Sequence, residues 1–362
     1  MVSAACSGLV QPERAQCRAR LGRDLQRTWL EQRVWQDDQD SARQTDLWLG
    51  IFGVNWRMLA NPAMLAEQVQ TIRHHQQGSF SELLVAMVQD PALQVMLNGP
   101  GNRRDNPNEN LARELLELFS LGEGHYSEID VREAARALTG FRLDHNQQLV
   151  LDPARHDSGP KTILGRTAAF DAPGLALWLC EQPATARHIS TRLWRRMIGT
   201  APPPQHLAQL ARRWRQQNLS LPWLMEQLLT SPEAVDSRRR GLRLSDPIEM
   251  IVRSLRLLGS RHPEAISTAL RGLASMGQPP FEPPSVKGWP INEQWLQLRW
   301  LEGRRRTLQA LLSNEEIWDA RQLPPQLSPE LTALPPLSLS LPAPPTRDNL
   351  SLLFADPVWQ LA

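Results

Sequence analysis

The sequence predicts an all-α protein, a compact multi-helix domain with one small β-hairpin near residues 141–151. Over most of the chain, apolar residues recur at the three- and four-residue spacing of amphipathic helices. Several helix starts carry a capping residue followed by proline, which has no amide hydrogen to leave unbonded there. Examples are Asp90-Pro91, Ser231-Pro232, Asp246-Pro247 and Asp356-Pro357.

The hairpin is predicted from two short apolar stretches, residues 141–143 and 149–151, on either side of a polar turn around His145-Asn146. An alternative architecture has two helical lobes that meet at this hairpin near residue 150. A chain of 362 residues is long enough to bury a large core in either arrangement.

Composition divides the chain into four predicted segments. Residues 1–45 are rich in Arg and Gln and form an N-terminal helical extension. Residues 46–320 form the helical core domain and carry all of the motifs described below. Residues 321–348 form a proline-rich connector, and residues 349–362 form a short C-terminal segment that docks through its apolar residues.

The overall charge argues against some classes of partner. A net charge of +2, from 40 basic and 38 acidic residues, gives no case for binding nucleic acid or an anionic membrane. The arginine runs at residues 238–240 and 304–306 are interpreted as helix ends or solvated faces. No apolar stretch reaches the length of a membrane span.

The cysteines and the N-terminus bear on the compartment. Cys6, Cys17 and Cys180 are odd in number and widely spaced, so they form no metal pattern and no evident disulfide framework. Cys180 is interpreted as a core residue. No run near the N-terminus matches the apolar region of a signal peptide, which predicts a cytoplasmic location.

The stretch from Asn108 to Leu121 is a predicted helix with two opposed faces. Asn108 can cap its start, and the polar face carries Asn110, Arg113, Glu114 and Glu117, with Glu109 at the edge. One interpretation is a solvated face with a ladder of ion pairs. The other is a buried polar stripe in which carboxylates and an amide hold a cation or perform acid–base chemistry. Spacing does not separate the two.

Rare residue types mark further candidates. Lys161 and Lys287 are the only lysines, and Tyr126 is the only tyrosine. In a chain that otherwise uses arginine, a retained lysine suggests a site that needs a compact ammonium rather than a planar guanidinium. Chance survival is the alternative.

Two loops carry the remaining candidates. In the loop of residues 156–161, Asp157 caps or orients a turn, while His156 is a ligand or a structural donor. Trp289, between Gly288 and Pro290, is a ligand platform or a core plug that fixes its proline-rich loop. Lys161 and Lys287 can each hold an anion or neutralise the glutamate stripe.

With these motifs, the chain resembles the bacterial family known as domain of unknown function 1800. The resemblance covers about residues 46–312. Its motifs are Asn108–Leu118, Leu121-Gly122, Tyr126, Asp130-Val131, Ala135–Gly140, the His156-Asp157, Gly159 and Lys161 element, and the element from Gly277-Gln278 to Gly288-Trp289-Pro290.

The chain differs from the proteins it resembles in one stretch upstream of these motifs and at its N-terminus. Similar proteins usually carry a histidine-containing stretch where residues 51–56 here read Ile-Phe-Gly-Val-Asn-Trp, without histidine. If those imidazoles bind a metal or act as bases, this copy is impaired. Similar proteins often begin with an export signal, which makes an exported location the alternative. They are often encoded beside a sulfatase-like family, which implies a sulfatase-like partner.

Two functions are compatible with these residues. The first is a non-catalytic or degenerate helical scaffold or partner protein, in which the polar residues form a buried network. The second is a cation-assisted hydrolase. Convergence of Glu114, Glu117, His156 and Lys161 in an open pocket favours the hydrolase, and saturation of their hydrogen bonds favours the scaffold.

The hydrolase would use a defined set of residues. The catalytic candidates are Glu109, Arg113, Glu114, Glu117, His156, Asp157 and Lys161. The candidate ligands of a divalent cation are Glu114, Glu117 and His156. The binding candidates are Asn108, Asn110, Tyr126, Asp130, Lys287 and Trp289.

Overall fold

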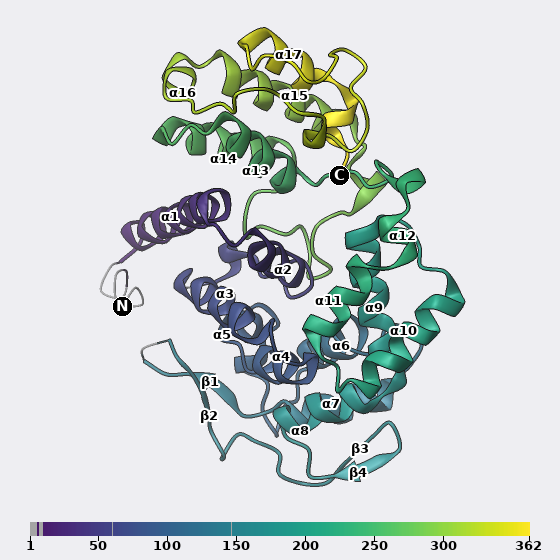
Figure 1. Cartoon of the computed structure of the whole chain (residues 1–362). Helices are drawn as coiled ribbons and strands as arrows, with labels where there is room; N and C mark the ends of the chain where they lie inside the picture. Colours follow the sequence, from purple (N-terminus) through teal and green to yellow (C-terminus); the bar gives the residue numbers. More distant parts are fainter. Residues whose placement is uncertain (1–5, 7–9, 60, 146) are drawn as a thin grey trace.

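Figure 1 shows the computed structural model, which describes residue 6 and residues 10–59, 61–145 and 147–362. The protein is mainly α-helical with small antiparallel hairpins, which confirms the predicted fold class. The predicted turn residue Asn146 lies outside the described residues. No described helix is both long enough and apolar enough to cross a bilayer.

The helices of the first half are α1 (Glu13–Trp35), α2 (Gln39–Leu49), η1 (Trp56–Met58), α3 (Ala63–His75), α4 (Phe80–Val88), α5 (Pro91–Met96), η2 (Gly99–Gly101), α6 (Asn110–Glu117), α7 (Glu128–Ala137) and α8 (Ala172–Glu181). Those of the second half are α9 (Pro183–Ile198), α10 (Pro204–Gln216), α11 (Leu221–Leu229), α12 (Pro232–Val235), η3 (Ser237–Arg239), α13 (Pro247–Leu258), α14 (Pro263–Ser275), η4 (Asn292–Trp295), α15 (Leu298–Ser313), α16 (Glu315–Asp319), η5 (Pro329–Leu331), α17 (Arg347–Ala355) and η6 (Pro357–Gln360).

The helix starts use the capping chemistry that the sequence predicts. The Asp90 side chain accepts the Leu93 N–H at the start of α5, with Pro91 in the first helical position. Ser127 opens α7 in a reciprocal capping box with Asp130. Each such cap satisfies backbone donors that a helix start leaves unbonded and contributes about 1 kcal/mol.

The predicted hairpin is confirmed and a second one follows it in the chain. β1 (Phe141–Leu143) pairs with β2 (Leu149–Leu151), with Phe141 opposite Leu151. β3 (Lys161–Ile163) pairs with β4 (Arg166–Ala168). The second hairpin turns through Leu164 and Gly165, both with positive φ, at 50° and 78°. Asn-Gly is the usual sequence signal for such a turn, so the second hairpin was not predicted from Leu-Gly.

The helices form an upper and a lower layer (Figure 1). The upper layer consists of α13 to α17, and the lower layer contains α2 to α12 with both hairpins at its base. α1 lies between them and packs against α13 and α14 above and α3 below. The C-terminus ends at the junction of the layers.

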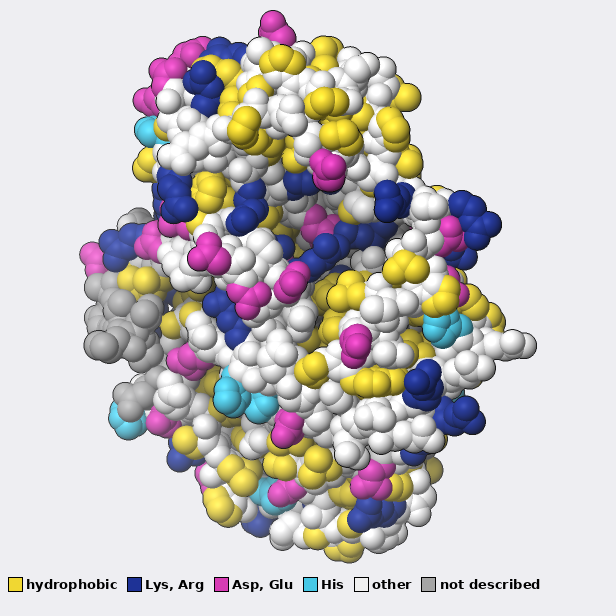
Figure 2. All heavy atoms as spheres, in the orientation of Figure 1, with side chains coloured by type: hydrophobic (Ala, Val, Ile, Leu, Met, Phe, Trp, Pro, Cys, Tyr) yellow, Lys and Arg dark blue, Asp and Glu magenta, His cyan; other side chains and the backbone are white. Residues whose placement is uncertain are grey.

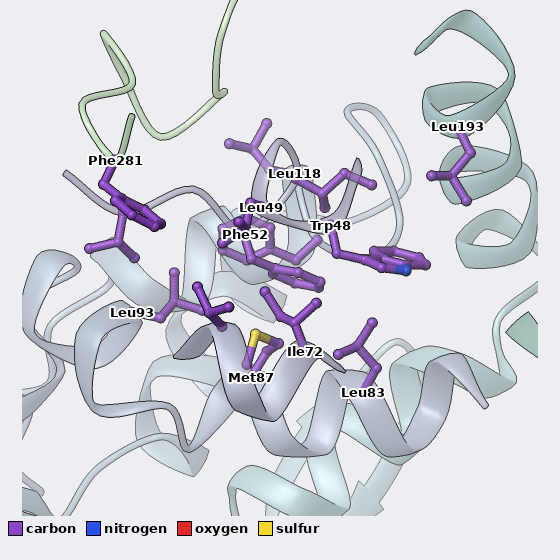
Figure 3. Close-up of a cluster of buried hydrophobic side chains, with 14 of the residues drawn as sticks. Trp48, Leu49, Phe52, Ile72, Leu83, Met87, Leu93, Leu118, Leu193 and Phe281 are labelled. Atoms are coloured by element: carbon purple, nitrogen blue, oxygen red, sulfur yellow. The ribbon is translucent and has the colours of Figure 1, made fainter. Parts of the chain in front are cut away.

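A continuous apolar core runs through both layers. Figure 3 shows part of it, where Trp48 and Phe52 face Ile72, Leu83 and Met87. Higher in the core, Trp29 of α1 meets Phe281 edge to face, with ring centroids 5.3 Å apart. Fully burying a side chain of this kind contributes roughly 1.5–3 kcal/mol. This contact therefore holds the loop of residues 277–290 firmly against α1.

One cysteine prediction is wrong. Cys6 and Cys17 form a disulfide that connects the chain before α1 to the first turns of that helix, with Cα atoms 5.9 Å apart. The sequence showed only an odd number of cysteines, and the separation of 11 residues between these two is not the spacing of a known disulfide motif. Cys180 is free and buried, as predicted for a core residue.

The proline-rich segment of residues 321–348 folds back on itself. Leu327 and Ala343 form an antiparallel bridge, and the Asp356 carboxylate accepts the N–H groups of Leu337 and Ser338. The C-terminal residues 349–362 contain α17, whose Leu350, Leu353 and Phe354 are buried. The division of the chain into four segments stays a prediction.

Candidate functional site

α6 occupies the centre of the predicted polar stripe, and asparagines arrange its start. The Asn102 side chain accepts the Asn108 N–H at 2.9 Å, and the Asn108 side chain accepts the Asn110 N–H at 2.9 Å. One face of the helix is buried through Leu111, Ala112, Leu115 and Leu116. The predicted two-faced helix is therefore present, with Asn108 in a capping role.

The Arg113 edge of α6 is a solvated ion-pair ladder. Its guanidinium contacts Glu128 of α7 at 2.8 Å and Glu109 at 3.1 Å. All three side chains are more than a third exposed. Exposed pairs of this kind contribute about 0–1 kcal/mol, so this edge positions α6 on α7 only weakly.

At the other edge lies a set that we call the α6 group: the half-buried Glu114, Glu117 and Tyr126 and the exposed Lys287. The Tyr126 hydroxyl donates to Glu117 at 3.3 Å, and the Lys287 ammonium lies 3.6 Å from the same carboxylate. Burial and the neighbouring Glu117 charge raise the pKa of Glu114. The late loop therefore reaches α6 as predicted, and two carboxylates share one short surface.

Residues that the sequence did not suggest complete this region from α9. Arg192 donates to the Leu118 carbonyl at 2.7 Å, and His188 Nε2 lies 3.2 Å from the same oxygen. Burial lowers the pKa of His188 to about 4 and that of Arg192 to about 9. Both side chains cap the C-terminal end of α6. Their spacing of four residues on one helix face was the available signal.

A second set, the α7 group, consists of Arg136, His156, Asp157 and Lys161. Arg136 donates to Asp157 at 2.7 Å and also contacts Glu133 at 2.8 Å. The Arg136 hydrogen bond holds the pKa of Asp157 below its usual range. The Asp157 carboxylate also accepts the Gly159 N–H at 2.9 Å, which shapes the tight turn after it.

Lys161 is buried at the start of β3, with 1% of its surface exposed. Its ammonium donates to the backbone carbonyls of Asp157 and Phe170, the latter at 2.8 Å. Burial lowers its pKa. A compact ammonium fits between two carbonyls where a planar guanidinium would not, which agrees with the retention of a lysine here.

His156 and Asp130 contact backbone. His156 Nδ1 lies 2.9 Å from the Thr139 carbonyl. Gly140 has a φ of 101°, and a Cβ there would lie 3.0 Å from the His156 Cα, so glycine permits the close approach of the two segments. Asp130 accepts the Leu164 N–H at 2.7 Å and so connects α7 to the second hairpin.

The two groups are separate. Among the described residues, no hydrogen bond or ion pair joins the α6 group to the α7 group. In the same part of the chain, no three His, Cys, Asp or Glu side chains are placed to hold a metal ion. The structure therefore does not bring the candidate ligands Glu114, Glu117 and His156 together.

Trp289 lies in a different place, on a partly open pocket of about 70 Å³ between the layers. Gly288 is positioned against the Gly50 carbonyl with a φ of 87°, which sets the path of the loop beside the pocket. Of the predicted site residues, only Trp289 lines this pocket. The indole N–H groups of Trp289 and Trp295 are buried there without an acceptor among the described residues.

Charged residues that the sequence analysis did not single out surround the same pocket. Burial raises the pKa of Asp46 to about 6, although its partner Arg33 opposes the change. Burial also acts on Glu249, but Arg243 at 2.6 Å lowers the pKa of this carboxyl to about 2. The Asp246-Pro247 cap was visible in the sequence, and Glu249 completes its capping box. The contacts of Glu249 with arginines could not be predicted from the sequence.

Comparisons with known proteins place the chain in a family. The family model described as "Protein of unknown function (DUF1800)" matches residues 4–360. Neither the curated proteins nor the solved structures contain a significant match. Because the family model spans nearly the whole chain, the protein belongs to the DUF1800 family.

Proposed function

We propose that the protein is a non-catalytic helical scaffold, in which the α7 group acts as a structural lock. The observation that supports this role is the use of Lys161. The ammonium that would stabilise charge in a reaction is buried and donates to two backbone carbonyls of its own chain. A group so occupied has little capacity left for a substrate.

The lock connects three segments. Arg136 belongs to α7, Asp157 to the loop after the first hairpin, and Phe170 to the residues just before α8. Lys161 and Asp157 therefore hold the second hairpin between two helices. Buried polar groups with all partners in place favour one arrangement of their elements, which suits a rigid scaffold.

Hydrogen–deuterium exchange tests the scaffold role. In Lys161→Met, residues 156–170 should exchange at least tenfold faster, because two buried carbonyls lose their donor and the loop opens locally. Lys287→Met is the matched control and should exchange like the wild type. Unchanged exchange in both variants would remove the argument for a lock.

A cation-assisted hydrolase is the second candidate, centred on the α6 group. It is favoured by the raised pKa of Glu114 beside Glu117, since perturbed carboxyl pairs are common at acid–base sites. Metal analysis of purified protein is the test. A stoichiometric divalent cation that Glu114→Gln loses would support this candidate. Metal-free protein with an unchanged fold in the variant would exclude the cation-assisted version.

The compartment and partner are also proposals. The Cys6–Cys17 disulfide favours the exported location, because disulfides persist mainly in oxidising compartments. Thiol alkylation of protein from native cells should label one cysteine without reductant and three with it. The sulfatase-like partner rests on family resemblance, and co-expression followed by size-exclusion chromatography would show whether the two proteins co-elute.

A further inference from the structure

A cleft between the two layers carries more positive charge than its surroundings. Two adjoining hollows, of about 630 and 660 Å³, share Arg43, Arg243 and Ala362 in their walls. We call them together the interlayer cleft. Figure 2 shows a band of dark-blue basic side chains in the hollow beneath the upper layer, and the basic residues in the cleft walls are arginines.

Arginines outnumber carboxylates in this cleft. The arginines in its walls are Arg33, Arg43, Arg239, Arg240, Arg243, Arg253 and Arg256, and the acidic residues are Glu233, Glu249 and Glu330. Glu249 pairs with Arg43 and Arg243, while Glu233 faces His206. Arg33 pairs with Asp46 outside the cleft walls.

Four arginines are left without a carboxylate partner among the described residues. Arg256 donates to the Val34 carbonyl at 2.6 Å, and Arg239 contacts the Thr200 hydroxyl at 3.3 Å. Arg253 donates to the Leu361 and Trp359 carbonyls, and its guanidinium carbon lies 4.3 Å from the Trp359 ring centroid. The Arg240 side chain makes neither an ion pair nor a hydrogen bond within the described part of the chain.

Arg253 adds a second observation. Its Nε atom is buried and has no acceptor among the described residues. Burial lowers its pKa to about 10, against the attraction of Glu249, a carboxylate that already pairs with Arg43 and Arg243. Burial of a cation with an unsatisfied N–H donor is unfavourable, and an anion in the cleft would relieve it.

The shape of the cleft limits the size of the anion. Each hollow falls within the range of roughly 300–1,000 Å³ that is usual for small-molecule sites. Guanidinium groups bind phosphate and carboxylate oxygens through paired hydrogen bonds. We propose that the interlayer cleft binds a small polyanion, with two or more phosphate or carboxylate groups, through Arg240, Arg253 and Arg256.

Isothermal titration calorimetry on the full chain tests the proposal with pyrophosphate and citrate as probes. Binding of at least one probe, weakening as sodium chloride rises from 50 to 300 mM, is the expected result. The tighter probe identifies the source as phosphate or carboxylate. Absence of binding for both probes overturns the proposal, and so does tighter binding of a poly-glutamate peptide, which would indicate a protein partner.

Matched variants distinguish binding by specific arginines from non-specific electrostatic attraction of the anion. Arg240→Gln and Arg256→Gln should each weaken the bound probe roughly tenfold, because each loses a charge-assisted contact. Arg238→Gln removes the same charge two residues from Arg240, but Arg238 is 88% exposed and pairs with Asp236 outside the cleft walls. It should weaken binding less than twofold. Equal losses in all three variants would overturn the proposal.

Discussion

The α7 group and the interlayer cleft both concentrate charge, and they differ in how that charge is used. In the α7 group, Arg136 meets Glu133 and Asp157, and Lys161 donates to two carbonyls. In the cleft, Arg240 and Arg256 have no carboxylate partner among the described residues. The first region carries the densest family motifs, whereas the second carries an isolated arginine run.

This difference separates structural from binding roles. Charged groups that are saturated by their own chain stabilise one arrangement of elements and have no free hydrogen bonds to offer a ligand. Charged groups without a counter-charge retain that capacity. Under the two roles that we propose, the family motifs around the α7 group are a guide to the fold, and the unpaired arginines are the guide to binding.

The largest expected effect would break the α7 group. Lys161→Met should lower the free energy of unfolding by about 3 kcal/mol, because the buried carbonyls of Asp157 and Phe170 lose their donor. Urea denaturation followed by circular dichroism measures the change. Lys287→Met removes the only other lysine, which is 71% exposed, and should change stability by less than about 0.5 kcal/mol. Equal losses of stability in Lys161→Met and Lys287→Met would refute a special structural role for Lys161.

The next effect tests the α6 end through pH. Burial lowers the folded-state pKa of His188 from 6.5 to about 4, so the unfolded chain binds the proton more strongly. Wild-type stability should therefore be complete above about pH 6.5 and fall as pH drops toward 4. His188→Gln lacks this loss and can still donate to Leu118.

The measured quantity is the difference in unfolding free energy between wild type and His188→Gln at pH 7 and pH 4.5. It should shift by about 2 kcal/mol in favour of the variant at the lower pH. His145→Gln, an exposed change on the first hairpin, provides the control and should show no shift. A flat difference for His188→Gln would contradict the burial of a neutral imidazole.

Asp46 beside the pocket should give a pH dependence of stability that is similar in size and opposite in sign. Its folded-state pKa is raised from 3.8 to about 6, so the folded chain holds the proton more strongly. The contribution of Asp46 to stability is greatest below about pH 4 and falls as pH rises through 6. Relative to Asp46→Asn, the wild type should therefore lose about 2 kcal/mol between pH 4 and pH 7. Asp105→Asn, at an exposed position, should show no such loss.

Local patterns predicted the fold well and the site only in part. Helix caps such as Asp90 and Ser127 act through neighbours three residues away, so the sequence shows both partners. The second hairpin was missed because Leu164 adopts a positive φ that glycine or asparagine usually supplies. The reach of Lys287 to Glu117 was anticipated from rare residue types and family motifs.

The remaining site features depend on packing between distant segments. Glu249 pairs with Arg43 across 206 positions of the chain, and Arg192 caps α6 from 74 positions away. No local spacing encodes such pairs, because helix periodicity shows which face is polar and not what covers it. For the same reason, the sequence could not show that His156 lies apart from Glu114 and Glu117.

The smallest effect concerns Tyr126, the single tyrosine of the chain, whose titration can be followed by its own absorbance. Burial raises its pKa, and the charge of Glu117 together with the hydrogen bond to it raises the pKa further. Glu117→Gln removes the charge and keeps an acceptor. The Tyr126 pKa should then fall by less than about one unit and stay above its usual value, because burial persists. Glu123→Gln, at an exposed neighbouring position, should lower it less. If Glu117→Gln left the Tyr126 pKa unchanged, the side chains of the α6 group would be close together without interacting. The comparison of paired and unpaired charged groups would then depend only on the α7 group and the interlayer cleft.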